Sequence, residues 1–360
     1  MIVNTKCADF KEENFYIGID THKRNWKVTV RTRDVELKTF SSEPLPEKLS
    51  NYMRHNYPNG RYHSVYEAGF CGYWIHRSLT ALQFNNIIVN PSDVPSTNKE
   101  RNSKSDPIDS RKLSRELANR SLRGIYIPTQ NQEALRCIHR NYKRKTRRLT
   151  QVKNQIKGLL CFCGIQLPQE YEGRCWSNKF IQYLSDLQMP SIEVKTVLGD
   201  QVEEFKHAKR SKLKSLKQIR DISKDIPLVR NLKTIPGVGI LTAFALFTEL
   251  INMKRFRNLD HLASYVGLVP SVQSSDTTVV VKGISFRHNK YLRSSLIESA
   301  WVAIRSDPAL LSAYNELTKR MKGNEAIVRI AKKLLNRIRY VWLNECEYVQ
   351  GLVSTEKVKA

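Results

Sequence analysis

The chain is predicted to have an α/β plus α fold, in which a strand-rich α/β domain precedes long basic helices and a mainly helical C-terminal module. Three observations predict it. Apolar and polar residues alternate with period two over residues 15–40, strand-like and helix-like segments alternate up to residue 91, and helical apolar spacing with little Gly or Pro prevails beyond residue 130. We expect domains at residues 14–130, 131–226 and 227–350.

The N-terminal segments predict a layered α/β domain. FYIGID, NWKVTVRT and DVELKTF are expected to form three strands of a meander, followed by a helix at PEKLSNYMRHNY. A strand at HSVYEAG, a helix around GYWIHRSLTALQF and a strand at NNIIVNP come next, and this alternation predicts that the later strands are parallel. An exposed loop from Pro91 to Ser105 should lead to a helix beginning near Asp106, and a last short strand is expected at GIYIP.

Composition points to a polyanionic partner. The 360 residues include 60 Lys and Arg against 34 Asp and Glu, a net charge of +26, which favours nucleic acid over a membrane surface. No apolar run of about 18 residues and no signal peptide is found, so we expect a cytoplasmic, nucleoid-associated protein. Seven scattered cysteines argue against a disulfide framework, and Cys161 and Cys163 are interpreted as buried thiols rather than zinc ligands.

Two basic stretches predict an antiparallel helical hairpin or coiled-coil arm. Residues 136–157 contain nine Lys or Arg and no acid, and residues 206–220 contain seven. A solvated helix face is the alternative, but like charges repel one another unless an anion lies against them, so contact with nucleic acid is favoured. The predicted contacts on the first helix are Arg140, Lys143, Arg144, Arg147 and Arg148.

The C-terminal module contains LKTIPGVGILTAFALFTEL, which resembles a helix-hairpin-helix DNA-binding motif. Gly237 and Gly239 would let backbone N–H groups at a helix N-terminus approach a phosphate; a buried helical turn is the alternative. The segment EAIVRIAKKLLNRIRYVW is amphipathic and is expected to close the core of the module rather than lie on a membrane surface.

Four acids are candidates for a metal site. Asp20 ends the strand FYIGID, Glu67 ends the strand HSVYE, and Asp106 and Asp109 open a helix in KSDPIDSRKL. The helical pair alone is explained equally well by capping. Carboxylates at the ends of apolar strands require a compensating cation, however, and two Mg²⁺ ions would compensate all four.

The order of these elements resembles the ribonuclease H-like fold of the RuvC type. The i, i+3 spacing puts Asp106 and Asp109 on one helix face, so that capping and catalysis are compatible. Nearby, His22 and Lys23 could act on a phosphate but are expected to be simply exposed. Tyr66, Tyr73 and Trp74 could stack on bases, although core packing is favoured.

A further string, LASYVGLVPSVQSSDTTVVVKGISFRHNKYLR, contains hydroxyls that on local grounds predict a solvated turn before the strand TVVV. Together with GIDTHK, YEAG, SDPIDSRKL and IPGVGILTA, it makes the chain similar to the DEDD transposases of the Piv and MooV type. This is the insertion sequence one-ten group, which consists of bridge-RNA-guided recombinases. The matching motifs span nearly the whole chain in the order of the family.

The resemblance implies that Asp20, Glu67, Asp106 and Asp109 bind Mg²⁺ and that Ser275, with Ser274 as the alternate, is the nucleophile. It also implies a structured bridge RNA, donor and target DNA, and a composite site between protomers of a bacterial dimer or tetramer. Arg287 and Lys290 are expected phosphate contacts. The sequence departs from the family pattern at three positions near the serine, which are Asp276, Phe286 and His288.

The predicted function is therefore that of an Mg²⁺-dependent DNA transposase or site-specific recombinase. The alternative is a RuvC-like Holliday-junction resolvase or nuclease in which metal-activated water attacks the phosphate. A non-catalytic nucleic-acid-binding protein is a third reading, and the complete set of four acids argues against it.

Overall fold

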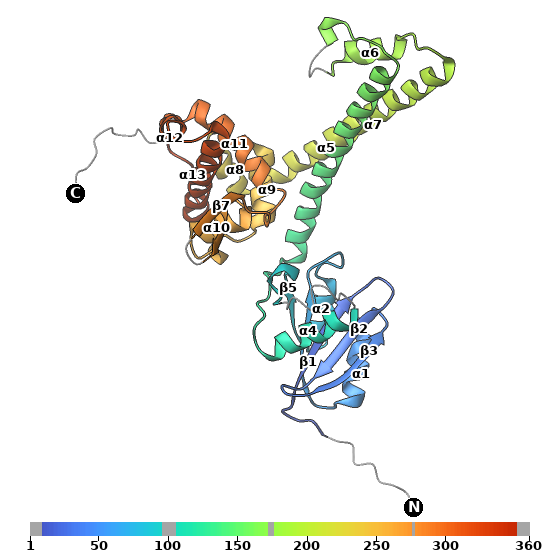
Figure 1. Cartoon of the computed structure of the whole chain (residues 1–360), viewed down its shortest axis with the longest axis vertical. Coiled ribbons are helices and arrows are strands. Elements are labelled where there is room, and N and C mark those ends of the chain that lie inside the picture. Colours follow the sequence, from blue (N-terminus) through green and yellow to red (C-terminus); the bar gives the residue numbers. More distant parts are fainter. Residues whose placement is uncertain (1–8, 96–105, 172–175, 276–277, 351–360) are drawn as a thin grey trace, which may run out of the picture. The chain divides into compact units, whose positions relative to one another are not determined.

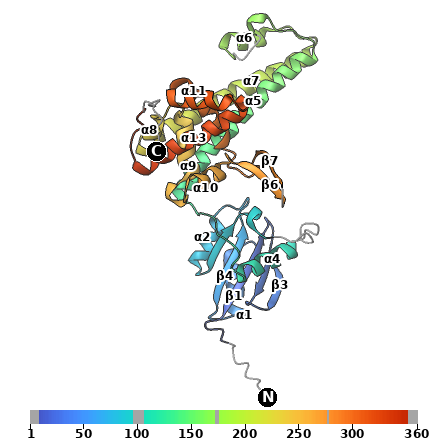
Figure 2. The same cartoon turned by 60° about the vertical axis from the view of Figure 1, so that its left-hand side comes forward.

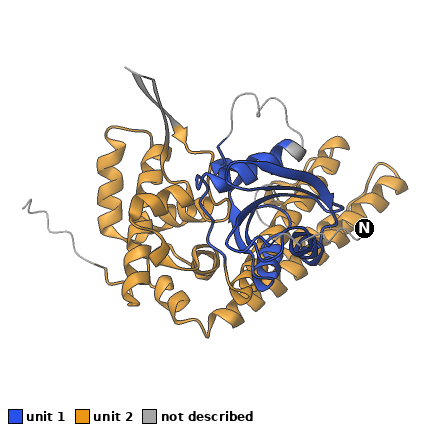
Figure 3. Ribbon diagram, turned by 90° about the horizontal axis from the view of Figure 1, so that it is seen from below, with its two compact units in different colours: residues 1–127 blue, residues 128–360 orange. Residues whose placement is uncertain are grey.

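The computed structural model describes residues 9–95, 106–171, 176–275 and 278–350. The side chains of residues 106–107 and 271–282 are not described. It divides into two compact units, residues 1–127 and 128–360, coloured separately in Figure 3. No helix within the described ranges is both long and apolar enough to cross a membrane.

The first unit is built on a five-stranded sheet of order β3-β2-β1-β4-β5 (Figure 1). Strands β1, β2 and β3 form an antiparallel meander, and β4 and β5 run parallel to β1, as the sequence predicted. The strands are β1 (Asn14–Thr21), β2 (Trp26–Arg31), β3 (Glu36–Ser42), β4 (Arg61–Glu67) and β5 (Asn85–Val89). The helices are α1 (Pro46–Asn56), α2 (Trp74–Ala81), η1 (Pro91–Asp93) and α4 (Asp106–Ala118).

Helices cover both faces of this sheet, and Figure 2 shows α2 and α4 on opposite sides of it. Ile17 and Ile19 of β1 are buried with Leu49 of α1 and Leu79 of α2. On the other face, Val65 of β4 and Val89 of β5 are buried with Leu113 of α4. Alternation along each strand therefore sends successive residues into two different cores.

Two predictions in the first unit need comment. The short strand predicted at GIYIP is wrong, because residues 124–128 have no strand structure and the backbone N–H of Ile125 donates a single hydrogen bond to Ile88 O (2.7 Å). Of the loop predicted over residues 91–105, only residues 91–95 lie inside the described ranges, and three of them form η1.

The second unit begins with the predicted helical arm, in which the long helices α5 and α7 pack side by side (Figures 1 and 2). A capping box between Thr129 and Gln132 fixes the start of α5. The elements are α5 (Gln130–Phe162), η2 (Gln169–Tyr171), α6 (Asn178–Asp186) and α7 (Ile192–Ser223). The prediction of buried thiols is wrong for Cys161, which is exposed near the end of α5, and Cys163 is only half-buried.

The rest of the second unit is a mainly helical module around one apolar core. Its elements are α8 (Pro227–Lys233), α9 (Ile240–Leu250), η3 (Met253–Arg255), α10 (Leu259–Val266), β6 (Pro270–Ser275), β7 (Thr278–Ile284), α11 (Arg293–Ser306), α12 (Pro308–Thr318) and α13 (Gly323–Asn344). The apolar face of α13 closes this core, as predicted, through Ile327, Ile330, Leu334 and Ile338.

Candidate functional site

Asp20 and Glu67 stand at the same end of two hydrogen-bonded strands. In the parallel register of β1 and β4, Ile19 lies opposite Tyr66, so that Asp20 and Glu67 are the next residues along. Both side chains are half-buried. The backbone therefore brings these two carboxylates to adjacent positions at the carboxyl edge of the sheet.

Helix α4 crosses the face of the sheet to which both acids belong. A Cβ atom on Gly18 would lie 2.1 Å from Ser110 O and 2.5 Å from Ser114 N, so α4 rests directly on β1 at this glycine. Because side chains two residues apart in a strand share a face, Asp20 lies on the face that α4 covers. Val65 packs in the cluster of Leu113 and places Glu67 on the same face.

The third acid, Asp109, is carried by α4 itself. It is half-buried and lies one residue before Ser110, the residue in contact with Gly18, and one helical turn before the buried Leu113. Asp106 is the first residue of α4, but its side chain is not among those described. Three of the four predicted acids thus approach one face of the sheet.

Hydroxyl groups hold α4 in this position. Ser110 Oγ lies 2.9 Å from Thr29 Oγ1 of β2, and Thr29 Oγ1 lies 2.9 Å from Thr39 Oγ1 of β3. Arg111 Nε also donates to Glu36 Oε1 (2.9 Å). Both Thr29 and Ser110 are buried, so the hydrogen bond between these two residues is shielded from water. The sequence did not reveal this chain of hydroxyls, whose only signal is a polar residue at a buried strand position.

His22 is exposed, as expected, but it has a specific contact. Its Nε2 lies 3.1 Å from Asp20 Oδ2. The turn that joins β1 to β2 also contains Lys23 and Arg24, which are both exposed. Positive charge therefore stands beside the candidate acids in the first unit.

The carboxylates fit Mg²⁺ in donor type, since hard oxygen ligands are what this ion prefers. Asp20, Glu67 and Asp109 would hold it, together with Asp106. Among the side chains that the structure describes, no group of three or more His, Cys, Asp or Glu residues is close enough together to bind a metal ion.

The turn after Glu67 is fixed by Tyr66, whose hydroxyl donates to Gly72 O (3.1 Å) and accepts from His76 N (3.2 Å). Tyr66 is fully buried, which confirms the core interpretation for this residue, and burial raises the pKa of its hydroxyl. Trp74 is 45% exposed, so the core interpretation is wrong there. Phe70, at 64%, is another exposed aromatic residue of this turn.

The candidate nucleophile lies in the second unit. Ser274 and Ser275 are the last residues of β6, and Ser275 is paired with Thr278 of β7 in the backbone register. Residues 271–275 of SVQSSDTT are therefore strand rather than turn, and residues 276 and 277 lie outside the described residues. Asp276, one of the three departures from the family pattern, lies outside the described residues.

The segment that follows β7 is anchored to α10. His288 Cβ occupies the space in front of Gly267, where an added Cβ would lie 2.2 Å from it, and Gly267 has a φ of +86°. Glycine at position 267 therefore leaves room for the side chain of His288, which is the second residue that departs from the family pattern. The third, Phe286, is 95% exposed, and the predicted phosphate contacts Arg287 and Lys290 are also exposed.

The predicted arm contacts differ in their surroundings. Arg144, Arg147 and Arg148 are exposed on α5, and Arg148 also pairs with Glu204 of α7. Lys143 is half-buried and donates to Ser295 Oγ (3.3 Å), and burial lowers its pKa. Arg140 makes two 2.9 Å hydrogen bonds to Glu249. Glu249 was missed by the sequence analysis, although it is the only acid in the apolar helix ILTAFALFTEL.

The two glycines of the PGVG turn also have different surroundings. Gly237 has a φ of +81°, and a Cβ there would lie 2.2 Å from Ser299 O of α11. Close packing against α11 thus explains Gly237. Gly239 is exposed at the N-cap of α9 with open space in front of it, and the predicted phosphate contact at this position stays a prediction.

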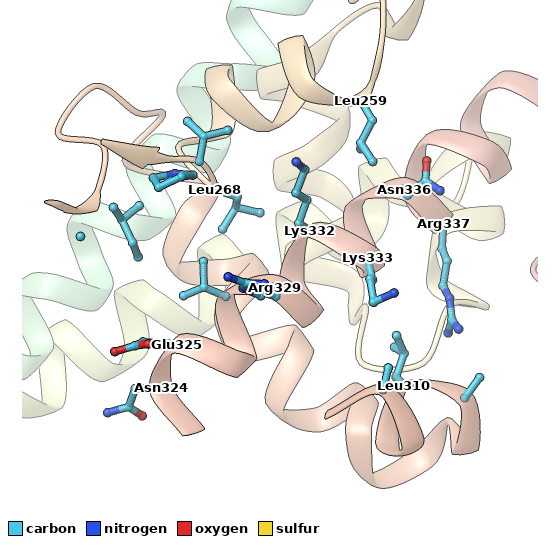
Figure 4. A pocket seen from close by; sticks show the side chains of 17 residues that line it. Leu259, Leu268, Leu310, Asn324, Glu325, Arg329, Lys332, Lys333, Asn336 and Arg337 are labelled. Atoms are coloured by element: carbon cyan, nitrogen blue, oxygen red, sulfur yellow. The ribbon is translucent and has the colours of Figure 1, made fainter. Parts of the chain in front are cut away.

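A groove of about 1170 Å³ opens between α10, α12, α13 and the base of the β6–β7 hairpin (Figure 4). Leu259, Leu268 and Leu310 contribute apolar surface to it. Arg329 and Lys333 of α13 are exposed beside it, and Lys332 is paired with Asp260 (2.7 Å). The groove therefore joins an apolar lining to a basic edge.

Comparison with known proteins identifies the class. One family profile, described as transposases of the IS116/IS110/IS902 family, matches residues 229–315. A second, the DEDD transposase profile of IS110, matches residues 17–164. All four candidate acids fall within the second match and Ser275 within the first. The chain belongs to the IS110 family of transposases of insertion sequences.

Individual relatives agree with this assignment. The y4rJ protein of Sinorhizobium fredii is 27% identical over 314 residues, 80% of this chain and 78% of that protein. The transposase for insertion sequence element IS1111A of Coxiella burnetii is 24% identical, covering 74% of this chain and 73% of its own length. The transposase for insertion sequence element IS1328 of Yersinia enterocolitica is 25% identical, with 68% and 72% covered.

Proposed function

We propose that the protein is a transposase that cuts and rejoins DNA, with Asp20, Glu67, Asp106 and Asp109 binding two Mg²⁺ ions and Ser275 as nucleophile. The observation that carries this proposal is the register of β1 and β4, which makes Asp20 and Glu67 neighbours on the face that α4 covers. Within a family of transposases, this arrangement supports a nuclease domain of the RuvC type.

The serine would act by direct displacement. Its oxygen would form a bond to phosphorus while the bond from phosphorus to one deoxyribose oxygen breaks. The serine proton would pass to solvent or a neighbouring base, and the released deoxyribose oxygen would take up a proton to become a free hydroxyl end of the DNA. The resulting phosphoserine link keeps the phosphodiester bond energy for rejoining. Bound Mg²⁺ would stabilise negative charge on the phosphate. Asp20 and Glu67, neighbours at the ends of β1 and β4, and Asp109 on α4 would supply oxygen ligands from that side of the sheet.

Basic surfaces would hold the nucleic acid. Arg144, Arg147 and Arg148 are exposed on the arm, and Arg287 and Lys290 follow the hairpin that contains Ser275. Contacts of this kind position a phosphate backbone without reading sequence. We therefore assign the choice of DNA sequence to a structured bridge RNA. We assign the catalytic site to an oligomer in which one copy supplies the acids and another supplies the serine.

The decisive experiment is the replacement Ser275→Ala, with Ser274→Ala as the matched control. Purified protein is incubated with its RNA, DNA ends and Mg²⁺, and covalent protein–DNA adducts are resolved on denaturing gels. Ser275→Ala should bind nucleic acid normally and form no adduct, while Ser274→Ala should retain the adduct. Cleavage by Ser275→Ala at the normal rate would instead support the resolvase-like mechanism, in which water is the nucleophile.

A further inference from the structure

The buried carboxylate of Glu249 joins three elements of the second unit. Its side chain is 1% exposed on α9, and Arg140 of α5 donates to both oxygens at 2.9 Å. Arg136 is also on α5, and its Nε lies 3.7 Å from Glu249 Oε2. Asn289, in the segment after β7, donates its Nδ2 hydrogen to Glu249 Oε2 (3.0 Å). One side chain thus binds the arm and the base of the hairpin together.

Glu249 remains ionised in this position. Burial acts to raise the pKa of its carboxyl, but the hydrogen bonds and charge of Arg140, with Asn289 and Arg136, outweigh burial and lower the pKa overall. A buried charge that is paired and hydrogen-bonded in this way is costly to disturb. The carboxylate therefore constrains the positions of the groups that donate to it.

The segment around Asn289 is a direct continuation of the hairpin. Ser285 N donates to Val269 O (3.1 Å) just beyond the last residue of β7, and Arg293 donates to Ser285 O (2.7 Å). Asn289 N donates to Tyr265 O of α10 (3.1 Å). These hydrogen bonds connect the segment that contains Asn289 to α10 and to the residues next to the ends of β6 and β7.

The arm is joined to the same segment by a ring contact. The Arg140 guanidinium lies 4.8 Å from the ring centroid of Tyr291, two residues beyond Asn289. The Tyr265 hydroxyl donates to the backbone oxygen of Glu249 (3.3 Å). Arg140 therefore contacts both the buried acid and the segment that this acid holds.

We propose that Glu249 is a positioning residue, which fixes the base of the β6–β7 hairpin relative to the arm helix α5. The inference rests on the proposed function in one respect. The position of the hairpin matters to catalysis because Ser275, the proposed nucleophile, lies on it. Nucleic acid held on the arm and the serine would then keep a constant geometry. A displacement of about 1 Å at a reacting group can cost a hundredfold in rate.

The test uses Asn289→Asp in the full-length protein, an isosteric change that replaces the donor to Glu249 by a carboxylate oxygen, which repels Glu249. Asn344→Asp, which alters an exposed amide that donates to Tyr340 O (2.8 Å), is the matched control. Hydrogen–deuterium exchange is followed over residues 283–292 and over α13. Nucleic-acid affinity and the single-turnover rate of adduct formation are measured separately, and Glu249→Gln provides a second variant.

Asn289→Asp should speed exchange over residues 283–292 about tenfold while exchange in α13 stays unchanged, and it should slow adduct formation about a hundredfold at unchanged affinity. Uniformly faster exchange, or an equal loss of affinity and rate, would show a merely structural role and overturn the inference. Unchanged exchange and rate would overturn it as well. If the wild-type protein forms no adduct, the proposed function fails, and the exchange result still decides whether Glu249 holds the hairpin.

Discussion

Replacing Gly18 with alanine tests how closely α4 must lie on the sheet. The added methyl group would stand 2.1 Å from Ser110 O, 2.5 Å from Ser114 N and 3.0 Å from Leu113 Cβ. Carbon makes favourable contacts at about 3.5 Å or more, and two of these three atoms belong to the helix backbone. The helix must therefore move outward by more than about 1 Å, since no flexible side chain can give way.

The cost follows from that movement. Overpacking a filled core costs about 1–3 kcal/mol, and losing the buried Ser110–Thr29 hydrogen bond adds about 1 kcal/mol. We expect Gly18→Ala to lose about 2–4 kcal/mol of unfolding free energy in urea titrations by these two terms. Because α4 contains Asp106 and Asp109, Mg²⁺-dependent cleavage should fall about a hundredfold even where the variant is folded.

Gly124→Ala is the matched control in the same unit. Its Cβ would meet Ile87 at 3.4 Å, an ordinary contact, so both stability and cleavage should be close to wild type. If Gly18→Ala were as stable and as active as Gly124→Ala, the close approach of α4 to β1 would not position the acids, and the reasoning would be refuted.

Three further predictions concern the second unit and the exposed turn of the first. Glu249→Gln should destabilise the protein by about 3–5 kcal/mol, against at most about 1 kcal/mol for Glu204→Gln on the arm surface, as measured by urea titration. Because the pKa of Glu249 is lowered on folding, the difference between wild type and Glu249→Gln should be constant above about pH 5 and shrink as the pH falls through the lowered pKa; a difference that grew in acid would contradict this sign. Trp74→Ala should weaken single-strand binding by about 1–3 kcal/mol if its exposed ring stacks on a base, and unchanged affinity in fluorescence titrations would exclude such stacking. Lys333→Ala should reduce the slope of log affinity against log salt by about one, whereas an unchanged slope would remove the α13 groove from the nucleic-acid surface.

The sequence predicted most of the sheet, because period-two alternation in the first unit coincides with two real cores. Ile17 and Ile19 pack on one side, while Gly18 and Asp20 belong to the other. The alternation of strands and helices predicted that the later strands are parallel, whereas the pairing of β1 with β4 is seen only in the structure. The positions of Asp20 and Glu67 at strand ends could therefore be predicted from the amino-acid pattern alone.

Other features depend on contacts between distant segments, and local patterns did not reveal them. Strand β6 has little apolar alternation and exists through its pairing with β7. GIYIP has the composition of a strand, and Ile125 N donates to Ile88 O, but residues 124–128 do not form a strand. Gly237 fits a phosphate-binding turn by its spelling, yet its conformation is explained by α11, which comes some sixty residues later in the chain.

The most direct test of the central claim is a count of the metal ions bound by the acids. Mn²⁺ serves as a spectroscopic substitute for Mg²⁺. Electron paramagnetic resonance distinguishes free Mn²⁺ from Mn²⁺ bound to the full-length protein, and so gives the number of ions bound. The account predicts that wild-type protein binds Mn²⁺ and that Asp20→Asn, Glu67→Gln and Asp109→Asn each weaken this binding, whereas Glu47→Gln, at an exposed position of α1, leaves it intact. Unchanged Mn²⁺ binding by Asp20→Asn and Glu67→Gln would contradict a shared metal site at the carboxyl edge of the sheet.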